Sequence, residues 1–155
     1  MPPVMEMIEQ PETKMLELVF SKEENYIRAN DLQGFLFYYN MYYMKFISEY
    51  NLNEINIYDL INQREELKSR FKFTKNDYLN YSRRIYSHSN DLLIFELEKH
   101  SPLKLVFGGS IIALVAALIL SGGTVEIDVS NGVFKAEINQ SLGKSLKDLK
   151  ELFED

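Results

Sequence analysis

The stretch SPLKLVFGGSIIALVAALILSGGTVEI, residues 101–127, decides how this sequence folds. Between Lys104 and Glu126 no side chain carries a charge. Because about 20 apolar residues in a helix cross the ~30 Å hydrocarbon core of a bilayer, the length of the segment favours a transmembrane helix over residues 103–122. Its strongly apolar part, residues 111–120, is only about half that length, which is more typical of a buried helix. We therefore expect a membrane span, and keep a buried or interface helix and a re-entrant segment as alternatives.

Small residues recur every four positions along this segment, at Gly109, Ala113, Ala117 and Ser121. In a helix these positions share one face, and small side chains there let two helix backbones approach closely. The spacing predicts a homo-oligomer built through these four residues. The prediction applies to helices paired in a membrane and to a helix buried between subunits.

The sequence on either side of this segment predicts an α+β chain with four parts. We expect a flexible leader over residues 1–12, a mixed α/β head over 13–100, the apolar helix over 103–122, and a tail over 124–155. The tail combines a β-hairpin with an amphipathic helix. Prolines and acids favour the leader, because they oppose regular structure.

Local patterns place the elements of the head. Leu16, Leu18 and Phe20 alternate with more polar residues, which predicts a strand with one buried face. An aromatic-rich pattern with spacings of three and four residues predicts a helix over residues 31–50. Thr74 followed by Asp77 is a capping-box pattern for the next helix. A beta-prone segment that ends in a strand over residues 93–97 completes the head.

The tail has the clearest local signal in the chain. Asn131-Gly132 is a favoured pair for a two-residue hairpin turn, because both positions need positive φ. The turn predicts cross-strand pairs between residues 129 and 134, 128 and 135, and 125 and 138. Leu142, Leu146, Leu149 and Phe153 then form a stripe on an amphipathic final helix that covers the hairpin.

Composition excludes several classes of function. The net charge of -6 lacks the basic excess that binding to a phosphate backbone needs, so nucleic acid is not an expected partner. There are no cysteines, which excludes disulfides and thiolate chemistry. His88 lies beside serines and Asp91, but a catalytic triad is assembled from separate elements. We expect no enzyme activity, no metal site and no cofactor.

The aromatic helix offers the one candidate for a ligand pocket. Its rings could stack on a flat ligand, and nearby arginines could neutralise an anionic one. The residues of this predicted pocket are Phe35, Tyr38, Tyr39 and Tyr42, with Arg28, Arg83 and Arg84. Ordinary core packing of the aromatic rings and solvation of the arginines are the alternatives.

Two functions follow from the two interpretations of the apolar segment. The first is a membrane-anchored, self-associating protein that contacts lipid and has a sensory or binding head, such as a membrane-perturbing effector in microbial defence. Four Lys or Arg lie between residues 83 and 104, whereas residues 121–141 contain only Lys135, so the head of this single-pass protein is expected in the cytoplasm. The alternative is a soluble, cytoplasmic α/β homo-oligomer that serves as a scaffold or binding module. In either case the head could bind a small ligand or a protein partner, whose identity the residues do not indicate.

Overall fold

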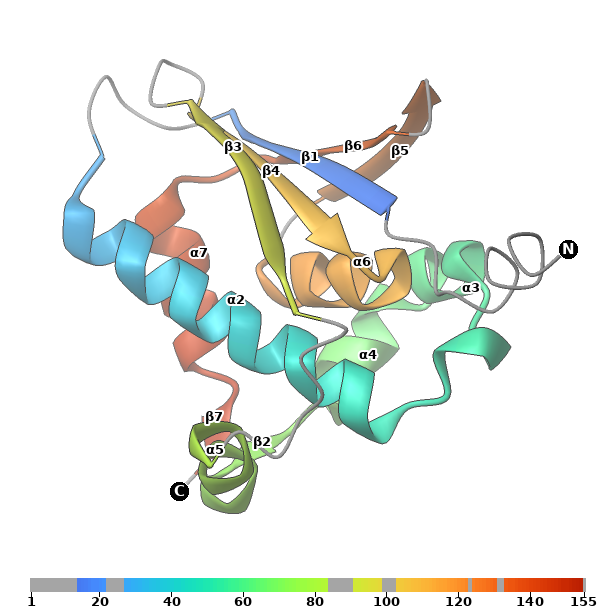
Figure 1. Cartoon of the computed structure of the whole chain (residues 1–155), viewed down its shortest axis with the longest axis vertical. Helices are drawn as coiled ribbons and strands as arrows, with labels where there is room; N and C mark the ends of the chain where they lie inside the picture. Colours follow the sequence, from blue (N-terminus) through green and yellow to red (C-terminus); the bar gives the residue numbers. More distant parts are fainter. Residues whose placement is uncertain are drawn as a thin grey trace, which may run out of the picture.

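The chain forms a mixed five-stranded sheet with helices packed on one face (Figure 1). The structure, a computed structural model, describes residues 14–21, 27–83, 91–98, 103–122, 124–130 and 133–154. The strands of the sheet are β1 (Lys14–Phe20), β3 (Leu93–Glu98), β4 (Leu103–Gly109), β5 (Thr124–Ser130) and β6 (Val133–Ile138). Their order across the sheet is β3-β4-β1-β6-β5, which leaves β3 and β5 at the edges.

The helices vary widely in length. They are α2 (Ala29–Glu49), α3 (Ile57–Asn62), α4 (Arg64–Arg70), α5 (Lys75–Ser82), α6 (Ile111–Leu120) and α7 (Leu142–Lys150), with a short 3₁₀ turn at Leu52–Glu54. A second, two-stranded sheet pairs β2 (Phe73–Thr74) with β7 (Phe153–Glu154). The expected α+β class is therefore confirmed.

Alternation along β1 divides the sheet into a covered and an uncovered face. Leu16, Leu18 and Phe20 are fully buried under the helices, as the sequence predicted. β1 pairs antiparallel with β4 and parallel with β6, and the inward residues of all three strands lie in rows. Figure 1 shows α2, α6 and α7 on this face of the sheet, which therefore holds the core.

The uncharged segment differs from the expected helix over residues 103–122. Its first part is the strand β4 in the interior of the sheet, and only residues 111–120 are helical. Residues 105–109 of β4 are all buried and α6 is enclosed on all sides, so neither stretch carries charge. Joined end to end, they have the composition of one long apolar helix. None of the helices in the described residues combines the length and the apolar composition that a bilayer span requires.

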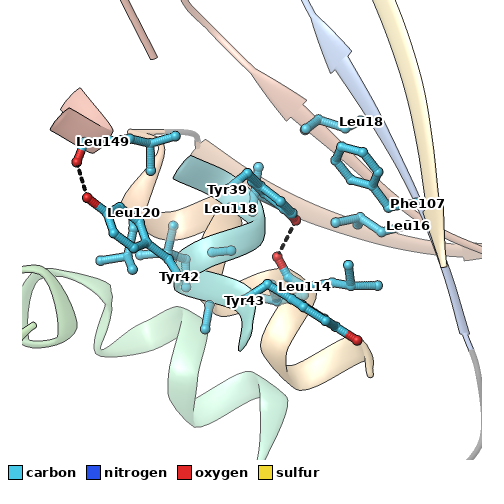
Figure 2. Packing of buried hydrophobic residues seen from close by; sticks show 14 of the residues in the cluster. Leu16, Leu18, Tyr39, Tyr42, Tyr43, Phe107, Leu114, Leu118, Leu120 and Leu149 are labelled. Carbon is cyan, nitrogen blue, oxygen red and sulfur yellow. Dashed lines mark hydrogen bonds between the residues drawn. The ribbon is translucent and has the colours of Figure 1, made fainter. Parts of the chain in front are cut away.

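α6 is the central helix of the core. It contacts β1, β4 and β5 of the sheet on one side, and α2, α3 and α4 on others. Residues 113–119 are each 0% exposed. Figure 2 shows Leu114, Leu118 and Leu120 of this helix packed beside the tyrosines of α2. Its hydrophobicity on every side is explained by this enclosure.

The turn from β4 into α6 depends on a glycine and a tyrosine. Gly109 has φ 151°, a backbone conformation that favours glycine. A Cβ atom placed there would lie 2.3 Å from the hydroxyl oxygen of Tyr43. The same hydroxyl accepts a hydrogen bond from the backbone N–H of Ser110, at 3.0 Å. Tyr43 of α2 thus occupies the space that any other residue at position 109 would need.

The hairpin β5–β6 follows the predicted register only near its turn. Val129 pairs with Phe134 and Asp128 with Lys135, as expected, whereas residues 131–132 of the turn lie outside the described part of the chain. Farther along, Thr124 pairs with Glu137, so the predicted pairing of Val125 with Ile138 was wrong. β5 carries additional residues between these pairs, an irregularity that shifts the register.

The final helix α7 confirms most of the predicted stripe. Ser141 caps its first turn by accepting a hydrogen bond from the Lys144 N–H. Leu142, Leu146 and Leu149 are buried, and Leu146 packs so closely on Gly34 that a Cβ there would lie 2.9 Å away. Phe153 departs from the prediction, because the helix ends at Lys150 and Phe153 belongs to β7.

Candidate binding site at the edge of the sheet

The aromatic residues of the predicted ligand pocket lie in the packed interior. Phe35 and Tyr39 face the sheet, where Tyr39 stacks on Phe107 with ring centroids 4.8 Å apart. Tyr42 packs on Phe71 and Phe73, and Tyr38 is half-buried beside it.

Two of the buried tyrosine hydroxyls donate to backbone carbonyls. The Tyr39 hydroxyl donates to the Leu114 carbonyl at 2.7 Å, and that of Tyr42 to the Leu149 carbonyl (Figure 2). Burial raises the pKa of both hydroxyls well above the usual value, so both stay neutral donors. These bonds tie α2 to α6 and α7. Ligand binding among the rings stays a prediction.

The described arginines of the predicted pocket lie at the ends of helices. Arg28 precedes α2 and is exposed, and Arg83 ends α5 and is also exposed. Arg84 lies outside the described residues, as does His88. A ligand site that combines these arginines with the rings stays a prediction.

The small-residue stripe is enclosed within the single chain. Ala113, Ala117 and Ser121 are each 0% exposed, and the Ser121 hydroxyl donates to the Ala117 carbonyl within the same helix. Gly109 is the last residue of β4, so it does not lie on a helix. Self-association through the stripe stays a prediction. In this fold it would require α6 to leave the core.

A buried ion pair joins α2 to α5. The Lys45 ammonium donates to the Asp77 carboxylate at 2.7 Å and lies 2.9 Å from Glu49. The same Asp77 oxygen accepts from the Thr74 N–H at 2.8 Å, which confirms the predicted capping box. Lys45 also lies over the ring of Phe71, 5.7 Å from its centroid. The cluster is closely partnered, so its role is to hold the helices together.

A second polar cluster closes the far end of α6. The Gln140 side-chain amide donates to the Ser121 carbonyl at 2.7 Å and approaches Ser145 and Asp148. Gly122 has φ 82°, and a Cβ there would lie 2.5 Å from a carboxylate oxygen of Asp148. These contacts satisfy a carbonyl that the helix leaves free at its C-terminus. In the part of the chain that the structure describes, no group of three His, Asp or Glu side chains could hold a metal ion.

Among the described residues, the edge strand β3 presents the most exposed run of apolar side chains. Leu93 is 44%, Ile94 49% and Phe95 53% exposed. β3 pairs with β4 on one side only, because it ends the sheet. Single exposed apolar residues are ordinary, but three consecutive ones on an edge strand form a surface that favours contact with another chain.

A bulge sets the direction of these side chains. The pairing of β3 with β4 shifts between Ile94 and Glu96, which leaves Phe95 without a partner in the ladder. The Phe95 ring instead lies over Gly108, where a Cβ would meet a ring carbon at 2.3 Å. Met15, 36% exposed, pairs with Gly108 from the other side. Leu93, Phe95 and Met15 therefore gather around Gly108 on the uncovered face of the sheet; we call these three residues the apolar patch.

Charged residues adjoin the apolar patch along the same face. The Lys104 ammonium lies 3.3 Å from Glu17, 3.8 Å from Glu96 and 4.0 Å from Glu98. The Glu17 carboxylate raises the pKa of Lys104, so this lysine remains charged. Three acids share one lysine here, so the charge of the acids is only partly neutralised. The C-terminal half of β3, with Glu96 and Glu98, is therefore acidic, whereas its N-terminal half is apolar.

Sequence reasoning found β3 as a strand but not as a site. The alternation of apolar and acidic residues in LIFELE predicts a strand with one buried face. Both faces of β3 are exposed because β3 lies at the edge of the sheet. That position is set by pairings between strands that are distant in sequence. The acids at residues 96 and 98 were the available signal, since edge strands often carry charge.

No protein-family model, curated protein or solved structure matches this chain. Fold and site together define a small α+β protein with an apolar sheet edge. Its own geometry is therefore the basis for the functional proposal.

Proposed function

We propose that this chain is a non-catalytic binding module that takes up an extended segment of another polypeptide at the edge of β3. The observation that carries the proposal is the exposure of Leu93, Ile94 and Phe95 on β3, a strand at the edge of the sheet. The proposal corresponds to the second of the two functions that the sequence suggests, a scaffold or binding module.

Strand addition is the interaction that suits such an edge. An added strand makes main-chain hydrogen bonds with the outer edge of β3 while its side chains cover the exposed apolar ones. Fully burying a large apolar side chain contributes about 1.5–3 kcal/mol, so covering three that are about half exposed contributes a few kcal/mol. Ordering costs reduce the net gain, so we expect a reversible rather than a permanent complex.

The acidic half of β3 limits where the added strand lies. Natural sheets protect their edges with charges and bulges, and Glu96, Glu98 and the bulge at Phe95 serve this purpose here. Residues 93–95 carry no charge, and Leu93 and Ile94 precede the bulge. The contact is therefore expected to centre on these three residues and on Met15 beside them.

Site-specific photocrosslinking tests the proposal. We expect p-benzoylphenylalanine in place of Phe95 to give a covalent adduct on irradiation of cells that produce the full chain. The matched control has the same residue in place of Phe37, which is 41% exposed on α2. Absence of an adduct at position 95, or equal adducts at both positions, would contradict the proposal.

A further inference from the structure

The directions of three neighbouring side chains suggest which polypeptide binds at β3. Ile94 pairs with Phe107, a residue fully buried on the helix-covered face, so Ile94 points toward that face. Leu93 pairs with Gly108, over which Phe95 also packs. Leu93 and Phe95 therefore both lie on the uncovered face, with Ile94 between them on the other.

We propose that the segment bound at the edge of β3 is β3 of a second copy of this chain, running antiparallel about a two-fold axis. Ile94 then lies opposite Ile94 of the second copy, and Leu93 lies opposite Phe95 of the second copy. This inference rests on the proposed function and names its partner. In an antiparallel pair, residues directly opposite each other share a face. The register satisfies that condition at all three positions, and it covers the three exposed apolar side chains of both copies at once.

Charge selects the antiparallel direction. A parallel pair of β3 strands would place Glu96 and Glu98 beside the same acids of the second copy, and like charges in such positions are destabilising. The antiparallel pair carries them to opposite ends. Glu96 of the two copies would be about four residues apart along the strand, or roughly 13 Å, which is beyond the ~10 Å screening length at 0.1 M salt.

The apolar patch extends the contact on the uncovered face. Met15 adjoins Phe95 across Gly108 in each copy. The two patches would therefore join into one apolar surface across the two-fold axis.

The bulge limits the strength of the contact. Beyond Phe95 the shift in register puts Glu96 on the uncovered face. Residue 92 of the second copy, which would lie opposite Glu96, is expected to point to the other face. Regular pairing therefore stops after three residues. A contact of this size belongs with weak, transient interfaces. We expect a dissociation constant between about 1 µM and about 1 mM.

Sedimentation equilibrium of the purified full chain at about 5 to 500 µM tests the inference. The wild type should change from monomer toward dimer over this range. Ile94→Lys places two like charges at the two-fold axis and should weaken association at least tenfold. Phe37→Lys adds the same charge to an exposed aromatic position elsewhere and should behave as the wild type. Thermal melts of each variant check that the fold is intact.

Charge complementation tests the register itself. Ile94→Glu alone should weaken association in the same way, whereas an equimolar mixture of Ile94→Lys with Ile94→Glu should restore the dimer, because opposite charges then face each other. Restoration is expected only if residue 94 faces residue 94. A mixture that stays monomeric, a wild type that is monomeric throughout, or association that Ile94→Lys leaves unchanged would overturn the inference.

The crosslinking experiment separates failure of this inference from failure of the proposed function. An adduct at position 95 with twice the mass of the chain supports both. An adduct with a different protein overturns the dimer and leaves the binding module standing. An adduct within one chain, or no adduct, overturns both.

Discussion

Replacing Leu118 with alanine should lower the free energy of unfolding by about 2–5 kcal/mol. Leu118 is 0% exposed and lies at the centre of the core, in the helix that contacts the sheet on one side and α2 on another. Removing its side-chain carbons would leave a cavity that neighbours on all sides cannot readily fill. Urea or guanidinium unfolding, followed by circular dichroism, measures the loss.

Leu93→Ala is the matched control, because it removes the same atoms from a side chain that is 44% exposed on β3. It should cost less than about 1 kcal/mol in the dilute monomer. A loss at Leu118 no larger than that at Leu93 would contradict the placement of α6 in the core. Protein concentration adds a second criterion. If α6 lies in the core, the loss of unfolding free energy in Leu118→Ala should not depend on protein concentration. If α6 instead formed an interface between copies, that loss should change with concentration.

Asp77→Ala should destabilise the chain by about 3–5 kcal/mol, because it leaves the buried Lys45 ammonium without its closest partner. The remaining contact with Glu49, which is half-exposed, favours the lower end of this range. The substitution also removes the side chain that caps α5 with Thr74. The control Glu66→Ala breaks an exposed pair with Arg70 on α4 and should cost no more than about 0.5 kcal/mol. Equal losses in the two variants would show that the Lys45–Asp77 pair is not buried in solution.

The effect of Asp77→Ala should depend on pH in a defined direction. Burial opposes ionisation of the Asp77 carboxyl, but hydrogen bonds from Lys45 and Thr74 outweigh burial and lower its pKa below the ordinary value of 3.8. Burial also opposes ionisation of the Lys45 ammonium, which by itself would lower the pKa of Lys45. The hydrogen bonds from Lys45 to Asp77 and Glu49 outweigh burial and raise this pKa above the ordinary value of 10.5.

A carboxyl with a lowered pKa stabilises the fold above its ordinary pKa and loses that contribution as the pH falls through the folded value. A lysine with a raised pKa stabilises the fold below its ordinary value and loses the contribution at higher pH. The difference between wild type and Asp77→Ala should therefore be constant from about pH 5 to about pH 9 and shrink below about pH 4. Unfolding curves that show a growing difference in acid would contradict this assignment.

Elements with a local physical cause were predictable from the sequence. The buried face of β1 came from alternation, and the cap of α5 from Thr74 and Asp77 at the required spacing. The paired residues next to the turn of the hairpin came from the conformational needs of Asn131-Gly132. Each of these depends on residues close in the chain, so the sequence contains the complete signal.

The segment over residues 103–122 shows where local patterns are insufficient. Apart from Lys104, β4 and α6 consist of apolar residues and glycine, and periodicity cannot separate a buried strand from a buried helix. The one boundary signal is the Gly108-Gly109-Ser110 triplet, which the structure uses as the turn between the two elements. That turn also requires Tyr43, which is distant in sequence.

The candidate site was hidden for a related reason. The sequence predicts that Leu93 and Phe95 lie on a strand, but their exposure follows from the sheet order β3-β4-β1-β6-β5. That order combines pairings of β1 with two strands distant in sequence. The bulge at Phe95, which puts Phe95 and Glu96 on the same face, has no local signal in LIFELE.

Hydrogen exchange at the edge of β3 tests the central claim most directly. Backbone amides that point away from β4 have no strand partner among the described residues of a single chain, so they should exchange quickly in dilute solution. Exchange within residues 91–98, followed by mass spectrometry at about 10 µM and about 500 µM, should slow at the higher concentration, while residues 14–20 of the interior strand β1 stay unchanged. Equal exchange of residues 91–98 at both concentrations would contradict the claim that this edge binds the strand of another copy.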